Sequence, residues 1–447
     1  MLATRAYEHS FLLPNPGVIV KTMSSPLSPK PSLRILWVGP VLDGRHFVNP
    51  GVSAAASVWQ QGLIASVLEQ FSPKPSETGN AVDDLPSNVS IELISHLPCQ
   101  SFPKGVLWPS SDGALFPKDF KGYGVSYCNL VWLRELILCW QYSRKIGEVL
   151  NANVQHPFDL IVSYNAEAYV SAPVAKWAKK RSLPWVSIIA DLPKNQPQVF
   201  LQNAKVEQAD GRLFLSWKNF QDFARPDQDL FLEGGVRLLE DSRATEGDLK
   251  LFSNLDSQIK RIAYFGGLTT LGGIDLFLQA TCQLPGSQYE FHVIGAGDRL
   301  TVSRVQSFAR ADSRIHYHGP ASERALIELG SSIDIFVDPR PMTLSENNFP
   351  SKLLTYLRFS KPIISTIGHG IPAEYKQVLI HLEQEDPEIL ARLIQDVCKW
   401  DPAYATQYQS TINEFVSNSK SWQAQGRRAA KWMSAILQKK SEKKHSV

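Results

Sequence analysis

The chain has 447 residues, which is enough for two or three domains of ordinary size that each bury a core. Its formal net charge is only +3, so bulk electrostatics gives no indication of a nucleic-acid partner. The five cysteines are odd in number and show no C-x-x-C spacing, which argues against a disulfide framework and a zinc site and favours a reducing compartment. We therefore expect a globular cytoplasmic protein.

The first 32 residues carry five prolines and lack a sustained apolar stretch. We expect residues 1–32 to be a disordered extension and not a signal peptide. The most apolar helical stretch, residues 130–140, contains Arg134 and Glu135 and is too short to cross a bilayer. No transmembrane segment is therefore predicted.

From residue 33 onward, short apolar runs alternate with helical patterns, as is typical of βαβ units. Several of the runs are almost continuously apolar, which predicts strands covered by helices on both faces. Strands are expected at 34–39, 90–95, 159–164, 185–191 and 212–216, and helices at 53–70, 129–151 and 167–180. Residues 33–240 thus form a first Rossmann-like domain.

A polar stretch interrupts this pattern, and we predict a linker over residues 241–258. The alternation then restarts and predicts a second Rossmann-like domain over 259–410, followed by a terminal helix that crosses back and a basic tail over 411–447. Strands are expected at 261–265, 290–294, 314–317, 333–337 and 362–365, and helices at 274–282, 301–309, 323–329, 351–359, 387–400 and 424–440. The predicted fold is α/β, with two doubly wound domains facing a central cleft at the carboxyl ends of both sheets.

A glycine-rich turn over residues 266–273 follows a strand and opens a helix. Glycines in such a turn let backbone amides approach a phosphate. The turn is not a Walker A loop, because Gly273 stands where that motif needs lysine, and the dinucleotide fingerprint G-x-G-x-x-G is absent. Residues 295–297 repeat the geometry after the next strand. Spacing alone leaves both phosphate contact and a simple tight connection open.

Residues 261–374 resemble the donor-binding domain of GT-B glycosyltransferases related to family 4. Seven segments carry the resemblance in order: 264–268, 273–280, 291–295, 318–319, 334–340, 348–357 and 361–366. The first half matches more loosely, at 158–165, 183–191 and 231–236. The resemblance implies a metal-independent hexosyltransferase-type enzyme without a bound cofactor, whose donor is a nucleotide-diphosphate sugar of the UDP or GDP type.

The segment around Lys352 is the strongest part of this resemblance. Pro350 suits a first helical turn, and Ser351 and Lys352 follow it, so a hydroxyl, free amides and an ammonium converge as a diphosphate requires. The competing interpretation is a solvated surface lysine. The donor-binding residues that we predict are Gly266, Gly267, Gly295, Arg340, Glu346, Asn347, Asn348, Ser351, Lys352, Leu353 and Thr355.

The sequence departs from family 4 at four positions. Gly267 and Gly272 stand where the family usually has Arg and Lys, and Asn347 and Thr355 stand at the positions of two glutamates. Xanthan-type glucuronosyltransferases also lack the Arg/Lys pair and rely on the lysine of the P-x-K segment. This sequence is similar to that group.

The acceptor is expected at loops that follow strands of the first domain, with Gly51 and Asn165 as contact residues. If the reaction inverts the anomeric configuration, Asp191 or Asp43 is the candidate base. If it retains the configuration, no base is needed, and Lys352 with backbone amides stabilises the leaving group. Either aspartate can equally be a helix or turn cap.

We predict no metal site. The D-x-D at 227–229 is interpreted as a solvated loop, and His292, His316 and His318 as residues of strand packing. Near the C-terminus, basic residues interleave with apolar ones. This pattern leaves open a peripheral contact with the inner face of the membrane, but favours an apolar stripe that packs on the first domain.

Taken together, these features predict a glycosyltransferase that uses a nucleotide sugar and a glycan or lipid-linked acceptor, in cell-surface or exopolysaccharide synthesis of the cell envelope. The alternative is a catalytically silent GT-B relative that binds a nucleotide or glycan, or acts as a scaffold.

Overall fold

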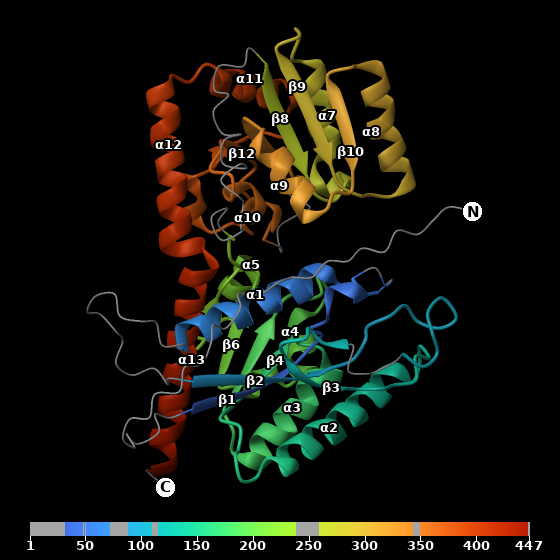
Figure 1. The fold of residues 1–447 in the computed structure, drawn as a ribbon, viewed down its shortest axis with the longest axis vertical. Helices are drawn as coiled ribbons and strands as arrows, with labels where there is room; N and C mark the ends of the chain where they lie inside the picture. Colours follow the sequence, from blue (N-terminus) through green and yellow to red (C-terminus); the bar gives the residue numbers. More distant parts are fainter. Residues whose placement is uncertain are drawn as a thin grey trace, which may run out of the picture. The chain divides into compact units, whose positions relative to one another are not determined.

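The computed structural model describes residues 32–47, 49, 51–71, 88–109, 115–237, 259–342 and 349–445 of the protein. The predicted extension up to residue 31 and the predicted linker lie outside these ranges. The chain divides into two compact units, each built on one parallel sheet (Figure 1). The first unit comprises the residues up to 215 with 223–232 and 426–447, and the second comprises 216–222 and 233–425.

The sheet of the first unit has seven parallel strands in the order β3-β2-β1-β4-β5-β6-β7. The apolar runs of the sequence form its central strands, and every residue of β4 and β5 is buried. The strands are β1 (Ser32–Val38), β2 (Asn88–Ser95), β3 (Lys121–Gly124), β4 (Leu160–Tyr164), β5 (Trp185–Ile189), β6 (Gly211–Phe214) and β7 (Leu230–Phe231). The order reverses between β1 and β4, which is the switch point of a doubly wound sheet.

Helices cover this sheet. They are α1 (Ala54–Phe71), α2 (Arg134–Ala152), α3 (Ala168–Arg181) and α4 (Pro197–Asn203), joined by the greater part of α13 (Trp422–His445). The glycine at 211 makes room for α13, because a Cβ there would lie 2.4 Å from Ile436 and 2.6 Å from Trp432. Met433 of the same helix is buried. The apolar stripe of the terminal helix therefore packs within the first unit.

The sheet of the second unit has six parallel strands in the order β10-β9-β8-β11-β12-β13. Its switch point lies between β8 and β11, whose pairing joins Ile262 to Ile335. The strands are β8 (Lys260–Phe265), β9 (Tyr289–Ile294), β10 (Ile315–Gly319), β11 (Ile335–Asp338), β12 (Ile363–Ser365) and β13 (Ile380–His381).

Two apolar cores form on opposite faces of this second sheet, because alternate strand residues point to opposite sides. Helices α7 (Ile274–Cys282), α8 (Arg299–Ala311) and α11 (Pro387–Cys398) contribute to one core, and α10 (Lys352–Leu357) and α12 (Pro402–Phe415) to the other. The unit also contains α9 (Glu323–Ser331) and most of α5 (Trp217–Phe223).

The predicted fold class, α/β with two doubly wound Rossmann-like units, is confirmed, and each of the ten predicted strands is present within two residues at either end. Three strands were not predicted: β3, which is the Gly-containing sequence Lys-Gly-Tyr-Gly, and the two-residue strands β7 and β13. All three lie at sheet edges, where burial adds little to a weak local preference. The start of α2 was predicted five residues too early, because the chain turns at residues 131–133 before the helix begins.

Candidate functional site

The carboxyl ends of β8, β9 and β11 meet at the switch point of the second sheet, where doubly wound folds bind ligands. Gly266 follows β8, Gly295 follows β9, and Asp338 ends β11. Both glycines have positive φ angles, 134° and 152°, which side chains rarely allow. A Cβ on Gly295 would lie 1.8 Å from the carbonyl oxygen of Gly266. The two turns therefore touch through their backbones.

Side-chain hydrogen bonds fix the glycine-rich turn. The hydroxyl of Tyr264 lies 2.8 Å from the carbonyl oxygen of Gly267 and 3.0 Å from that of Gly272. The hydroxyl of Thr269 accepts a hydrogen bond from the amide of Gly272 at 2.9 Å. Gly267 itself is exposed, and a Cβ there would meet nothing within 4 Å. The side chains of Tyr264 and Thr269 thus fix the turn, and its backbone is exposed at residue 267.

Lys352, the first residue of α10, reaches this turn from the other side of the switch point. Its Nζ lies 2.9 Å from Oδ1 of Asp338, 3.3 Å from the carbonyl oxygen of Gly272 and 4.2 Å from the ring centroid of Tyr264. Its side chain is only 11% exposed. The structure therefore excludes the interpretation of Lys352 as a solvated surface lysine.

Asp338 is the unpredicted partner of Lys352 and is 1% exposed. Although the Lys352 ammonium is close, neither carboxylate oxygen accepts a well-aligned hydrogen bond from a residue that the structure describes. Nε of Arg340 lies 3.9 Å from Oδ1 of Asp338 and donates no well-aligned hydrogen bond to a residue that the structure describes. Burial lowers the pKa of Lys352, and the nearby carboxylate offsets only part of this effect. Under-satisfied buried polar groups of this kind are typical of ligand sites.

The remaining predicted donor residues lie around this cluster. Ser351 is exposed before α10, Thr355 is half-buried, and the side chain of Leu353 is fully buried in the apolar core, which leaves only its backbone for a ligand. The helix has six residues, not the nine predicted over 351–359, since the chain turns after Leu357. Glu346, Asn347 and Asn348 lie outside the described residues.

The predicted acceptor residues lie at the corresponding end of the first sheet, after β1, β4 and β5. Asp43 caps a 3-10 turn (η1, Gly44–His46): its Oδ1 accepts hydrogen bonds from the amide (3.0 Å) and Nε (2.7 Å) of Arg45. Partial burial acts to raise its pKa, but the contacts with Arg45 and His46 together lower it. Asp191 follows β5 and is exposed as a whole residue, but partial desolvation of its carboxyl by the surrounding protein raises its pKa. Asp191 is thus the better proton acceptor of the two.

Asn165 and Gly51 are held by backbone geometry. Asn165 follows β4 with a φ of 60°, and its Oδ1 accepts a hydrogen bond from the amide of Ala166 at 2.9 Å. Gly51 has a φ of 100°, and a Cβ there would lie 2.7 Å from the carbonyl carbon of Cys99. Both residues therefore shape loops at this end of the sheet.

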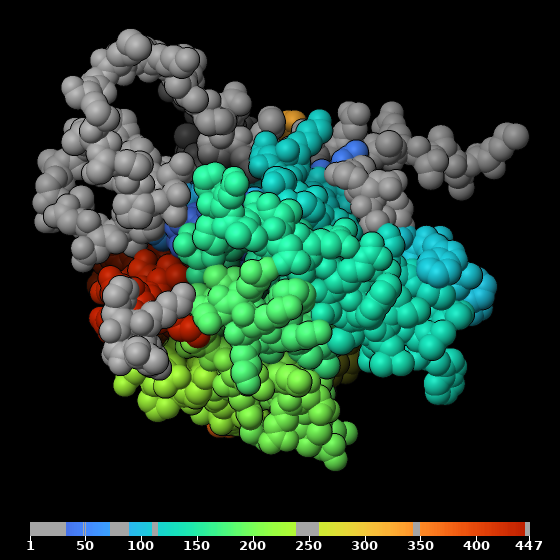
Figure 2. All heavy atoms as spheres, turned by 90° about the horizontal axis from the view of Figure 1, so that it is seen from below, coloured from blue at the N-terminus to red at the C-terminus, as the bar shows by residue number. Residues whose placement is uncertain are grey.

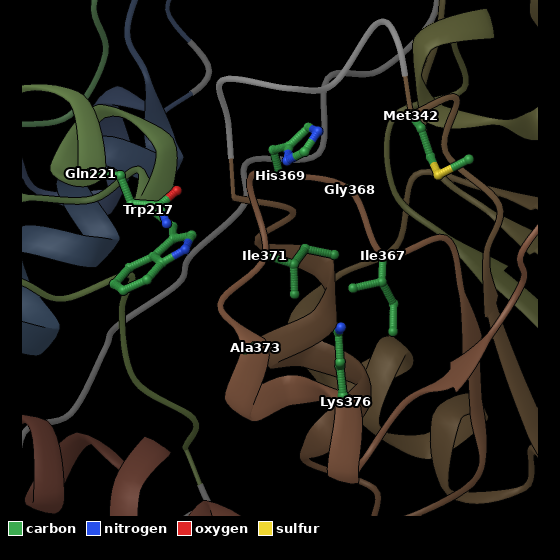
Figure 3. Close-up of a pocket in the computed structure, with 9 residues that line it drawn as sticks. All are labelled: Trp217, Gln221, Met342, Ile367, Gly368, His369, Ile371, Ala373 and Lys376. Carbon is green, nitrogen blue, oxygen red and sulfur yellow. The ribbon is translucent and has the colours of Figure 1, made fainter.

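A pocket of about 510 Å³ lies in the second unit, at the ends of β11 and β12 (Figure 3). The ammonium of Lys376 points between Ile367 and Ile371, and the indole of Trp217 faces Ile371. It is lined by Trp217, Gln221, Met342, Ile367, Gly368, His369, Ile371, Ala373 and Lys376. The sequence analysis did not predict these residues. Most of them follow strands β11 and β12, and residues after the carboxyl ends of parallel strands are expected at ligand sites, as was argued for Gly266.

The pocket adjoins the ion pair of Lys352 and Asp338. The hydroxyl of Thr366, next to Ile367, donates a hydrogen bond of 2.6 Å to the carbonyl oxygen of Arg340. Arg340 lies beside Asp338, and Met342 of the pocket follows two residues later. The Lys352–Asp338 ion pair and the pocket therefore both lie at the carboxyl ends of the strands of the second sheet.

No group of three His, Cys, Asp or Glu side chains in the described part of the chain is arranged to hold a metal ion. His292 stacks on His316 and His318, with ring centroids 5.1 Å and 5.3 Å apart, and burial lowers the pKa of His292 to about 4. The D-x-D interpretation as a solvated loop was wrong for Asp229, whose carboxylate is fully buried and pairs with Arg212 (2.7 Å) and Arg225 (2.8 Å).

Sequence and structure comparisons agree with this geometry. Residues 259–399 match the family described as Glycosyl transferases group 1. No curated protein sequence matches the chain significantly. Among solved structures, a glycosyltransferase from Rickettsia africae is 15% identical, with a TM-score of 0.64 and coverage of 91% of this chain and 99% of that one.

Two further structures are similar over most of their length. Sucrose-phosphate synthase from Thermosynechococcus elongatus is 14% identical, with a TM-score of 0.60 and coverage of 91% of this chain and 99% of its own. The HepE protein of Anabaena, solved in complex with UDP, is 14% identical, with a TM-score of 0.59 and coverage of 90% and 100%. At such identities the likeness shows the fold, which is that of the GT-B glycosyltransferases. With the family match, it supports a GT-B glycosyltransferase.

Proposed function

We propose that the protein transfers a sugar from a nucleotide-diphosphate donor of the UDP or GDP type, and that Lys352 binds the pyrophosphate. One observation carries the proposal: a lysine buried at a sheet switch point lies 2.9 Å from an under-satisfied carboxylate and beside a fixed glycine-rich turn. The complex of HepE with UDP supports a uridine nucleotide as the first ligand to test.

The chemistry that these residues offer is stabilisation of the leaving group. As the glycosidic bond breaks, negative charge develops on the pyrophosphate, and a preorganised ammonium beside it lowers the barrier. Arg340 supplies a second positive charge at the same edge. We propose that no metal ion takes part, as in the resemblance to family 4 and its xanthan-type relatives.

We propose a glycan or lipid-linked acceptor bound near Gly51 and Asn165, in cell-surface or exopolysaccharide synthesis. For an inverting reaction Asp191 is the proposed base, because its exposed carboxyl has a raised pKa while Asp43 is already engaged by Arg45. The pocket around Trp217 offers space for a sugar on the donor side. The protein would work in the cytoplasm, at the inner face of the membrane.

A catalytically silent relative is the second candidate, because Gly267 and Gly272 leave the turn without the two cations that family 4 usually has. Calorimetric titration with UDP and with GDP, followed by donor hydrolysis measurements, separates the two. Binding of either nucleotide with turnover of its sugar donor supports the transferase. Binding without any turnover supports a silent relative that binds a nucleotide. Binding of neither nucleotide contradicts the transferase and leaves a silent relative that binds a glycan or acts as a scaffold.

A further inference from the structure

Exposed apolar side chains gather at one end of the first unit. Trp132 is 90% exposed, Leu136 69%, Trp108 67% and Trp140 60%. We define the tryptophan patch as these four side chains together with three exposed neighbours. The neighbours are Val106, Val131 and Leu133.

The patch is continuous because a loop and a helix are bonded together. Leu136 and Trp140 are spaced by four and therefore share one face of the first turns of α2, and Trp132 lies in the turn immediately before the helix. The loop with Val106 and Trp108 is fastened to the start of this helix by Asn129, whose amide bonds the carbonyl of Leu107 at 2.8 Å and whose side chain bonds that of Val106 at 2.9 Å. Figures 1 and 2 show the loop and the beginning of α2 side by side.

The face of α2 that carries Leu136 and Trp140 takes no part in the apolar core. Leu138, Tyr142 and Ile146 are buried on the opposite side, and α2 packs against α3. The first turns of the helix thus carry apolar residues on both sides. A helix with one packed side and one solvated side usually carries polar residues on the solvated side. Exposed apolar side chains that cluster together mark interaction surfaces.

We propose that the tryptophan patch inserts into the interfacial layer of a phospholipid bilayer. Indole rings favour the interface, since their faces are apolar and their N–H groups stay hydrated, while leucine and valine enter the acyl region. The segment 101–150 has six basic and four acidic side chains. Three of its basic residues form ion pairs, Lys121 with Glu92 and Arg144 and Lys145 with Glu148, so Lys104 and Lys118 are the side chains that best complement anionic headgroups. Lys104 and Lys118 are exposed, and the Arg144 guanidinium lies 5.9 Å from the ring centroid of Trp140.

The same loop connects the patch to the candidate acceptor end. The amide of Asp43 bonds the carbonyl of Leu115 at 3.0 Å, and Gly51 packs on Cys99. A bilayer at the patch would therefore present a lipid-linked acceptor beside the ends of β1 and β4, so the inference rests on the proposed function for its purpose. The terminal helix is the less suitable anchor, because its apolar stripe packs within the first unit.

The described helices include none that is long and apolar enough to cross a membrane, so the proposed contact is peripheral. We would measure flotation of the full chain with vesicles of phosphatidylcholine and phosphatidylglycerol, and quenching of its tryptophan fluorescence by brominated lipid. The proposal expects the protein to float with the vesicles and to be quenched. The double variant Trp132→Ser/Leu136→Ser should partition at least about tenfold more weakly, since binding scales with the apolar area inserted.

The matched control is Val154→Ser/Leu300→Ser, which removes side chains that are 64% and 78% exposed at other places. It should float like the unmodified protein. Equal loss in both variants, or no flotation of the unmodified protein, would overturn the proposal. So would a dimer in sedimentation equilibrium that the Trp132/Leu136 variant dissociates while vesicle binding is unchanged, because the patch would then be a protein interface.

UDP titration of the same variants separates this inference from the proposed function. The tryptophan patch variant should bind UDP like the unmodified protein, since it changes only exposed side chains of the first unit. Vesicle binding without any nucleotide binding would leave the patch standing and remove the transferase. Nucleotide binding without vesicle binding would remove the membrane role of the tryptophan patch and leave the proposed transferase standing.

Discussion

The second unit contains two buried pairs of a lysine and a carboxylate, and they differ in how completely they are satisfied. Lys420 and Glu233 are 0% and 4% exposed, and their network is full. Lys420 pairs with both Glu233 and Glu374, and Glu233 also accepts hydrogen bonds from the hydroxyl of Tyr375 (2.7 Å) and the side chain of Gln425 (3.3 Å). A complete network of this kind holds two distant chain segments together.

The pair of Lys352 and Asp338 is incomplete by comparison. Asp338 has one close cation and no well-aligned donor from the described residues, and Lys352 borders the backbone of an open glycine-rich turn. Desolvation without full compensation is unfavourable, and such groups are retained where a ligand completes them. The difference indicates a structural role for Lys420 and supports the ligand-binding role that we propose for Lys352.

The largest expected effect is on stability. Lys420→Met leaves Glu233 buried without its cation and should lower the free energy of unfolding by about 3–5 kcal/mol. Urea and thermal unfolding would measure it. Lys399→Met is the control, because Lys399 forms an exposed pair with Asp396 at 3.5 Å and should change stability by less than about 1 kcal/mol. Equal effects of the two substitutions would contradict the structural role of Lys420.

Lys352→Ala should act mainly on binding, and its effect on stability should be smaller than that of Lys420→Met because Arg340 remains 3.9 Å from the Asp338 carboxylate. We expect UDP or GDP affinity to fall by about 1.5–3 kcal/mol, as for the loss of a hydrogen bond to a charged group. Calorimetry measures the affinity, and the urea midpoint should move far less than in Lys420→Met. Unchanged affinity would remove Lys352 from the site.

The sequence was sufficient for the fold and for the lysine, but not for the partners of the lysine. Apolar runs predicted every central strand, since burial on both faces leaves a composition that can be read locally. Lys352 was singled out by the resemblance to family 4, and its position after Pro350 at a strand-to-helix corner agreed with that resemblance. Asp338 was overlooked, because an aspartate that ends an apolar strand equally suits a turn, and only the packing of β11 against α10 brings it to the ammonium.

Two other outcomes depend on tertiary structure in the same way. Lys420 and Glu233 are 187 residues apart, and no local pattern marks them as a pair. The exposed face of α2 was visible as an apolar stretch, but its composition alone predicts burial. Only the structure shows that Leu138 is buried while Trp132 and Trp140 are exposed.

Asp338→Asn tests whether the carboxylate maintains the charge of Lys352. Burial lowers the pKa of Lys352 and Asp338 opposes this, so the amide should lower that pKa further. A neutral amine cannot bind a diphosphate, so affinity is lost as the pH rises through the pKa of Lys352. The alkaline decline in UDP affinity should therefore move to lower pH in the variant. Asp312→Asn, in a half-buried pair with Arg314 elsewhere in the second unit, should leave the pH profile unchanged.

The smallest expected effect is a gain. The family-4 resemblance expects Arg at position 267, where a Cβ would meet nothing within 4 Å, so Gly267→Arg adds a cation to the under-satisfied site without steric conflict. We expect UDP affinity to rise by about 1 kcal/mol, at the low end for a charged hydrogen bond because the position is exposed. Gly272→Lys is the matched comparison: its Cβ would lie 2.4 Å from the hydroxyl of Tyr264 and 2.8 Å from the carbonyl oxygen of Gly267, so it should distort the turn and weaken binding. If both cations tightened binding equally, the turn would not have the fixed geometry on which the assignment of Lys352 depends. If neither changed the affinity, the pyrophosphate would have to lie elsewhere.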